Sequence, residues 1–135
     1  MSHAEGSATI ASSLGSHAEG VQAQATSTGA HAEGFDTTAS GRASHAEGEE
    51  TIASGVNAHA EGYLSEASGD YSHAQGHDTT ASGESSTSEG ESTTAGGKAA
   101  HAEGSSTTAS GDYSHTEGLG SRVTATGIAG HAEGE

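Results

Sequence analysis

The chain has 135 residues, of which 29% are hydrophobic, and it carries a formal net charge of −16 with only three Lys and Arg residues. Low hydrophobicity with high net charge excludes a core of large aliphatic and aromatic side chains, and the acidic balance excludes nucleic-acid partners. Cysteine is absent, and no apolar run approaches the ~20 residues needed to cross a bilayer, so we expect neither disulfides nor membrane insertion by this segment.

A fourteen-residue unit organises the chain, and it predicts a series of coils from the N-terminus to the C-terminus. Each unit contains His-Ala-Glu-Gly or a close variant, except that one copy reads Thr87-Ser88-Glu89-Gly90. Counted from the residue before each His, the predicted coils start at Ser2, Ser16, Ala30, Ser44, Ala58, Ser72, Ser86, Ala100 and Ser114, with a partial coil from Gly130. The last full unit is two residues longer, and we place this insertion around Leu119–Val123.

Within each unit, small residues and glycines recur at fixed positions. Positions 1, 3, 8 and 10 are small, position 5 is Gly, and position 12 is Gly in most units; position 10 is Ala throughout, with Ala125 filling it after the insertion. We expect strands of about five residues at positions 1–5 and 8–12, with Gly at 5 and 12 supplying the backbone angles of two turns. Strand residues alternate faces, so the small residues face inward and positions 9 and 11 face outward. The prediction is an all-β, single-domain parallel β-roll of nine to ten coils over residues 1–135.

Positions 2 and 4 also share one outward face, yet they are as restricted as the interior. We expect self-association to constrain them, with three chains placing three His and three Glu around an axis at each coil. The predicted interface residues are His3, Glu5, His17, Glu19, His31, Glu33, His45, Glu47, His59, Glu61, His73, Gln75, His101, Glu103, His115, Glu117, His131 and Glu133.

The unit Ser-His-Ala-Glu-Gly-x-x-Thr-x-Ala-x-Gly-x-x resembles the head repeat of trimeric autotransporter adhesins of the YadA type, Ser-Val-Ala-Ile-Gly-x-x-Ser-x-Ala-x-Gly-x-x. The resemblance covers Ser2 to Gly134. It implies a left-handed parallel β-roll that assembles as a homotrimer. His and Glu replace the apolar pair of the family pattern, so the resemblance implies a polar trimer interface. Similar His-Ala-Glu-Gly repeats also resemble those of bacterial and prophage surface or tail-fibre proteins.

Three interpretations of the His and Glu positions remain open from sequence. In the first, each His donates to a Glu of its own or a neighbouring chain, which fixes register and chain number and raises the His pKa while lowering that of Glu. In the second, three symmetry-related imidazoles bind Zn²⁺, Ni²⁺ or Co²⁺, with Glu as a ligand or supporting partner. The candidate metal ligands are His3, His17, His31, His45, His59, His73, His101, His115 and His131. In the third, the face is solvated and the chain is monomeric.

The repeated pattern favours a structural protein over an enzyme, because an active site normally breaks the symmetry of a repeat. The one break lies at Gly118–Gly127 and shows no nucleophile–base arrangement. We therefore expect an extracellular rod without a required cofactor, on a bacterial cell surface or a phage virion. The first hypothesis is a trimeric head or shaft segment of an adhesin that displays its turns to a host or matrix ligand. The alternatives are a tail-fibre or spike shaft and a metal-binding trimer.

Overall fold

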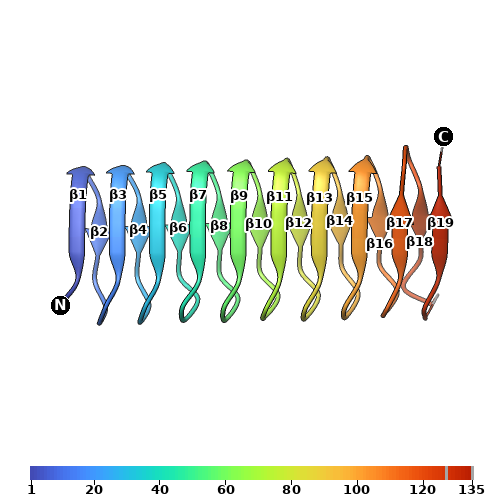
Figure 1. Cartoon of the computed structure of the whole chain (residues 1–135), viewed down its shortest axis with the longest axis horizontal. Coiled ribbons are helices and arrows are strands. Elements are labelled where there is room, and N and C mark those ends of the chain that lie inside the picture. The colour runs from blue at the N-terminus through green and yellow to red at the C-terminus, as the bar shows by residue number, and fades with distance from the viewer. Residues whose placement is uncertain (127, 135) are drawn as a thin grey trace.

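The chain winds into a rod of parallel coils, with its N-terminus at one end of the long axis and its C-terminus at the other (Figure 1). The computed structural model describes residues 1–126 and 128–134. Odd-numbered strands form a ten-stranded sheet and even-numbered strands form a nine-stranded sheet behind it (Figure 1). Since adjacent strands lie about 4.8 Å apart, the rod is roughly 45 Å long. The predicted parallel β-roll of nine to ten coils is confirmed.

The two sheets differ in strand length. The longer strands are β1 (His3–Ser7), β3 (His17–Val21), β5 (His31–Phe35), β7 (His45–Glu49), β9 (His59–Tyr63), β11 (His73–His77), β13 (Thr87–Glu91), β15 (His101–Ser105), β17 (His115–Glu117) and β19 (His131–Glu133). The shorter strands are β2 (Ile10–Ala11), β4 (Gln24–Ala25), β6 (Thr38–Ala39), β8 (Ile52–Ala53), β10 (Glu66–Ala67), β12 (Thr80–Ala81), β14 (Thr94–Ala95), β16 (Thr108–Ala109) and β18 (Arg122–Val123).

Every coil pairs with the next in register, so like positions stack on like. His17 pairs with His31, and Ala25 pairs with Ala39. The predicted second strand of five residues is wrong, since only positions 9 and 10 pair as a strand. The chain turns directly afterwards: the N–H groups of Ser40 and Gly41 both donate to the carbonyl oxygen of Ala53, at 2.9 and 3.2 Å.

Among the described residues, the interior contains Ala, Ser and Thr side chains, as predicted for positions 1, 3, 8 and 10, together with Val123 in the last full coil. Ala18, Ala32, Ala46 and Ala60 at position 3 are fully buried, and so are the position-10 alanines from Ala25 to Ala109. Fully buried threonines occupy position 8. At position 1, a serine hydroxyl donates to the carbonyl oxygen three residues earlier, as in Ser44 to Gly41 at 2.8 Å. The core is therefore narrow. Some of its hydroxyls bond to the backbone of the corners, whereas those of Thr37, Ser86, Thr107 and Thr116 have no hydrogen-bond partner.

The left-handed residues of the turns lie at positions 7 and 14, which the sequence interpretation left unassigned. Asp36 and Leu64 at position 7 have φ near +54°, and Tyr71 at position 14 has φ +60°. These angles turn the N–H toward the preceding coil; that of Asp36 donates to Val21 at 2.8 Å. The prediction for Gly at position 5 is confirmed, with φ between 91° and 130° in all nine such glycines from Gly6 to Gly118.

Gly at position 12 has a different role from the predicted one. Its φ is not positive, so it supplies no unusual backbone angle. Instead, a Cβ on Gly69 would overlap the carbonyl group of Gly83 in the next coil. The glycine is needed because successive coils approach closely at this corner.

Non-glycine residues at the left-handed positions offer a route to stabilisation. Leu64 has φ +54°, and its side chain is exposed. An L-residue in this region costs about 1–2 kcal/mol, and asparagine tolerates it best after glycine. We expect Leu64→Asn to raise the free energy of unfolding by about 1 kcal/mol in a denaturant titration. Leu64→Ala, which keeps the backbone strain, is the control and should give no such gain.

The insertion in the last full coil lies after the second strand, which corrects the predicted placement at Leu119–Val123. Val123 pairs with Ala109 and is buried, so it occupies position 10. Ala125 is exposed and does not continue the alanine row. The extra residues therefore lengthen the turn that leads to β19, because the strand register is maintained up to Val123. Gly127, part of the predicted break, lies outside the described residues.

Candidate functional site: the His–Glu face

The residues at positions 2 and 4 of each fourteen-residue unit lie on the odd-numbered strands and form one outward surface, here called the His–Glu face. Alanine at position 3 points inward between them, so the alternation of the strand places His and Glu side by side. In the middle of the rod, the side chains of His45 and Glu47 are 35% and 36% exposed. The predicted shared face is confirmed, and within one chain it is half-buried.

The imidazoles form two continuous columns along the rod. Neighbouring ring centroids lie 4.6–5.1 Å apart from His3 to His73, and again from His101 to His131. The rings of His31, His45 and His59 stack in parallel, with interplanar angles of 2°. Thr87 interrupts the column between His73 and His101. The stacking follows from the parallel register, which places each ring above its equivalent.

Eight of the nine position-2 imidazoles lie beside the glutamate two residues later, whereas His73 is followed by Gln75. The distance from His Nε2 to the carboxylate oxygen is 3.3 Å at His31–Glu33 and 3.6 Å at His59–Glu61. These distances exceed the 2.7–2.9 Å of a charge-assisted hydrogen bond. The Nε2 atoms of His17, His31, His45, His59, His101 and His115 are inaccessible to solvent and have no hydrogen-bond partner.

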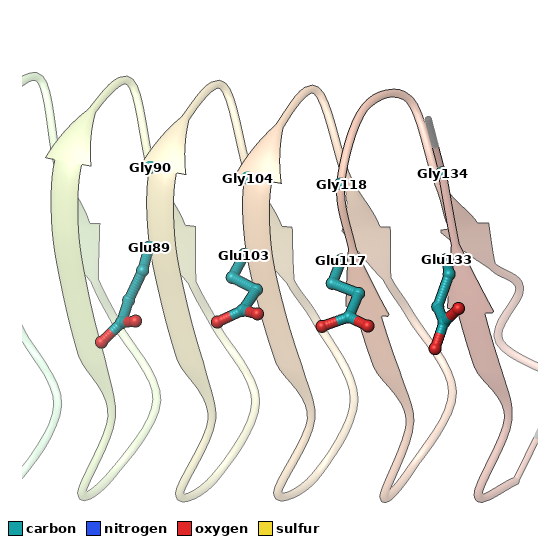
Figure 2. A pocket seen from close by; sticks show the side chains of 8 residues that line it. All are labelled: Glu89, Gly90, Glu103, Gly104, Glu117, Gly118, Glu133 and Gly134. Atoms are coloured by element: carbon teal, nitrogen blue, oxygen red, sulfur yellow. The ribbon is translucent and has the colours of Figure 1, made fainter.

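The carboxylates border a shallow groove along the same face. Glu89, Glu103, Glu117 and Glu133 project from successive strands in one row, beside the glycines that follow them (Figure 2). Glycine lacks a side chain, so the position-5 column leaves the groove open. A second groove runs beside Glu33, Glu47, Glu61 and Gln75.

Residues 32–58, 46–65, 67–90 and 74–100 match the YadA head domain repeat. Together these matches cover half of the chain. The chain belongs to the YadA head family. No curated protein matches it significantly. Among the residues described in this YadA head, there is no helix of the length and apolarity required to span a membrane.

The protonation equilibria of this YadA head differ from the expectation for paired His and Glu. Burial, followed by the neighbouring His45 and His17, lowers the pKa of His31, while Glu33 and Glu19 act in the opposite direction. Burial also lowers the pKa of His59, with His45 and His73 adding to the effect. In one chain, the pKa of these two residues is therefore lowered rather than raised, because burial, and then repulsion between stacked imidazoles, disfavours the protonated form. The pKa of Glu133 is lowered, as expected for a paired Glu, chiefly through its hydrogen bond with His131.

A pH dependence follows from the lowered pKa of His31 and His59. An unfolded His titrates near pH 6.5, so below that pH the unfolded chain binds protons that the folded chain does not. We expect the thermal midpoint, measured with a chelator present, to be constant above about pH 7 and to fall as the pH drops below about 6.5. The double variant His31→Thr/His59→Thr should show a weaker fall, since Thr87 already occupies this position. A midpoint that rises on acidification would contradict the prediction.

Adjacent coils bring His and Glu together in groups that could hold a metal ion. Ligand atoms lie within 4.8 Å of one another in five groups: His31–Glu33–His45, Glu47–His59–Glu61, Glu89–His101–Glu103, Glu103–His115–Glu117 and Glu117–His131–Glu133. Six of the nine predicted His ligands are included, and His3, His17 and His73 are not. The sequence interpretation missed these groups because it sought ligands on a three-fold axis. The fourteen-residue spacing was the available signal, since it places Glu of one coil beside His of the next.

Proposed function

We propose that this YadA-family chain is a head or shaft segment of a trimeric bacterial cell-surface adhesin, with a structural and non-catalytic role. In this assembly, three rods lie side by side and their His–Glu faces meet at a shared three-fold axis. The observation that carries the proposal is the His–Glu face itself. Its residue types vary as little from coil to coil as those of the buried interior, yet in one chain the face is partly exposed. Membership of the YadA head family supports the same function and favours the adhesin over the tail-fibre alternative.

The surface of the His–Glu face supports burial against other chains. Six inner imidazoles have Nε2 atoms shielded from water and without a hydrogen-bond partner. Buried polar atoms without partners are costly, so a neighbouring chain that supplies polar groups would stabilise the rod. The grooves beside the carboxylates leave room for side chains of such a neighbour.

The corners at the far end of the longer strands provide a varied surface for external contacts. Val21, Phe35 and Tyr63 occupy position 6 in successive or nearby coils and are 37–45% exposed. Tyr63 also stacks on the exposed His77 of the next coil, with ring centroids 5.3 Å apart. Exposed aromatic residues are enriched at binding surfaces. In the proposed adhesin, these corners contact a host or matrix ligand.

The assembly is tested by the mass of the protein in solution. Light scattering should give three times the chain mass of 13.0 kDa. We expect His45→Asp/His59→Asp to dissociate the trimer, because it adds negative charge to a face already lined with carboxylates. The matched control Ile10→Asp/Ile52→Asp adds the same charge on the even-numbered sheet, where both isoleucines are exposed, and should stay trimeric. A wild-type mass of one chain would refute the trimer.

A further inference from the structure

The His–Glu face contains a second capability that a single chain already provides. We propose that adjacent coils bind divalent transition-metal ions of the zinc type, with imidazole Nε2 and carboxylate oxygens as ligands. The ligand groups lie within one chain, between consecutive coils, rather than on a three-fold axis. The ligand groups are therefore present in one chain without the proposed assembly.

The ligand sets recur along the rod because the register is constant. In four of the five groups, one imidazole lies between the carboxylates of its own coil and of the preceding one. The remaining group has two imidazoles and one carboxylate, at His31, Glu33 and His45. Three protein ligands with positions left for water or another ligand are a common arrangement for zinc. Glu103 and Glu117 each belong to two groups, and their two oxygens allow them to bridge neighbouring ions.

In four of the five groups, the His–Glu distance within a coil fits a bound cation better than a direct hydrogen bond, whereas His131 and Glu133 are hydrogen-bonded at 3.0 Å. Two ligands of a tetrahedral zinc ion, each about 2.0–2.1 Å from the metal, lie about 3.4 Å from each other. The Nε2–Oε distances are 3.3 Å at His31–Glu33 and 3.6 Å at His101–Glu103. The longer separations, between coils, can close by rotation of the glutamate side chains.

The electrostatics of the face also favour a cation. The carboxylates of Glu103 and Glu117 follow one another along the rod (Figure 2), and each adjoins the other within one ligand group. In the described part of the chain, Lys and Arg form one ion pair, between Lys98 and Glu84, and neither residue is on this face. The shielded Nε2 atoms lack partners. A metal ion would satisfy the imidazole lone pairs and neutralise the carboxylate row together.

The ligand chemistry selects the class of ion. Calcium and magnesium prefer oxygen ligands alone, whereas imidazole with carboxylate suits Zn²⁺, Co²⁺, Ni²⁺ and Cu²⁺. Every group contains at least one imidazole and at least one carboxylate. We therefore assign the groups to borderline transition-metal ions rather than to calcium.

The chain carries its own interruption of the pattern. Gln75 replaces Glu at position 4, and Thr87 replaces His at position 2 of the next coil. None of the five ligand groups includes Gln75 or Thr87. The groups therefore form an N-terminal set, which ends at Glu61, and a C-terminal set, which begins at Glu89. Restoring both ligands should join the two sets.

The test measures ions bound per chain by equilibrium dialysis against ZnCl₂ followed by elemental analysis. Gln75→Glu/Thr87→His should bind at least one more ion per chain than the wild type. Glu103→Gln/Glu117→Gln removes a ligand from three of the five groups and should reduce binding to the ions of the N-terminal set. Glu49→Gln/Glu50→Gln loses the same charge at exposed positions outside the groups, and should bind as the wild type does.

Cobalt provides a readout of ligand geometry, since Co²⁺ bound by imidazole and carboxylate in tetrahedral geometry gives visible absorption that hydrated Co²⁺ lacks. The wild type should show this absorption, and circular dichroism should confirm that each variant is folded. Three outcomes would overturn the proposal. The first is no zinc binding by the wild type, and the second is an equal loss of binding in Glu103→Gln/Glu117→Gln and in Glu49→Gln/Glu50→Gln. The third is unchanged binding in Glu103→Gln/Glu117→Gln. The last result would point to imidazoles of three chains around an axis. A monomeric mass in light scattering, by contrast, would leave the ligand groups intact.

Discussion

Gly62→Ala is expected to destabilise the rod by at least about 3 kcal/mol, as the sum of backbone strain and steric overlap. Gly62 has φ +106°, a region that L-residues rarely adopt, and a Cβ there would overlap the carbonyl group of Gly76 in the next coil. The neighbouring coil cannot withdraw without losing its own hydrogen bonds, because each coil is paired on both sides. Chemical denaturation followed by circular dichroism measures the loss, and an unchanged midpoint would contradict the close packing of the position-5 column.

Two further glycines separate the two causes. Gly69 has no positive φ, but its Cβ would overlap Gly83, so Gly69→Ala tests overlap alone. Gly29 has φ +69°, and its nearest neighbour atoms, in Ala43, are 3.8 Å or more away, so Gly29→Ala tests strain alone. Ala43 already adopts φ +56° at the equivalent position. We expect Gly29→Ala to cost about 1 kcal/mol, Gly69→Ala more, and Gly62→Ala the most.

The coil architecture could be predicted because the sequence repeats the same physical requirements nine times. Alternation of small and variable residues identified the interior, and Ala18 and Thr37 are fully buried as expected. Ile52 is exposed, as its place at position 9 of the repeat predicted, although its hydrophobicity alone would have placed it in the interior. Periodicity therefore outweighed composition, which by itself favours a disordered chain.

Local backbone geometry was less accessible from the sequence. Left-handed residues such as Leu64 and Tyr71 carry no signal, because the turn imposes φ on whichever residue stands there. The same limit explains the error at Ala125: an alanine two residues late looked like a member of the row, whereas strand pairing selected Val123. A β-branched valine tolerates the strand position, so residue type did not decide the register.

The His–Glu face was predicted as a surface, but its contacts depend on stacking between coils. The sequence suggested pairs of His with Glu of its own or a neighbouring chain, which would raise the pKa of His. In the structure each imidazole inside a column also faces two others, as His45 faces His31 and His59. Burial and His–His repulsion together outweigh the glutamates at His31 and His59. Such a balance requires distances in three dimensions, which a linear pattern does not contain.

Ala60→Leu is expected to destabilise the rod by about 3 kcal/mol, because leucine is larger than any side chain in this buried row, Thr116 included. Ala60 is fully buried between the two sheets, in the row that contains Ala46 and Ala74. The chain itself shows how much space this row allows: Ser88 occupies the same position, and its hydroxyl already lies 2.8 Å from that of Thr93 on the opposite wall. Leucine adds three carbon atoms, so the sheets would have to separate over several coils.

Ala60→Ser and Ile52→Leu are the matched controls for this change. Serine adds one atom that the row accepts at Ser88, and we expect a loss of about 1 kcal/mol or less. Ile52 lies on the outer side of the shorter sheet, where its side chain is 42% exposed, so Ile52→Leu should leave the denaturation midpoint unchanged. If Ala60→Leu melts with the wild type, the sheets can separate without loss of stability. The narrow interior would then not be what holds the coils together, and the backbone ladders alone would have to carry the stability of the rod.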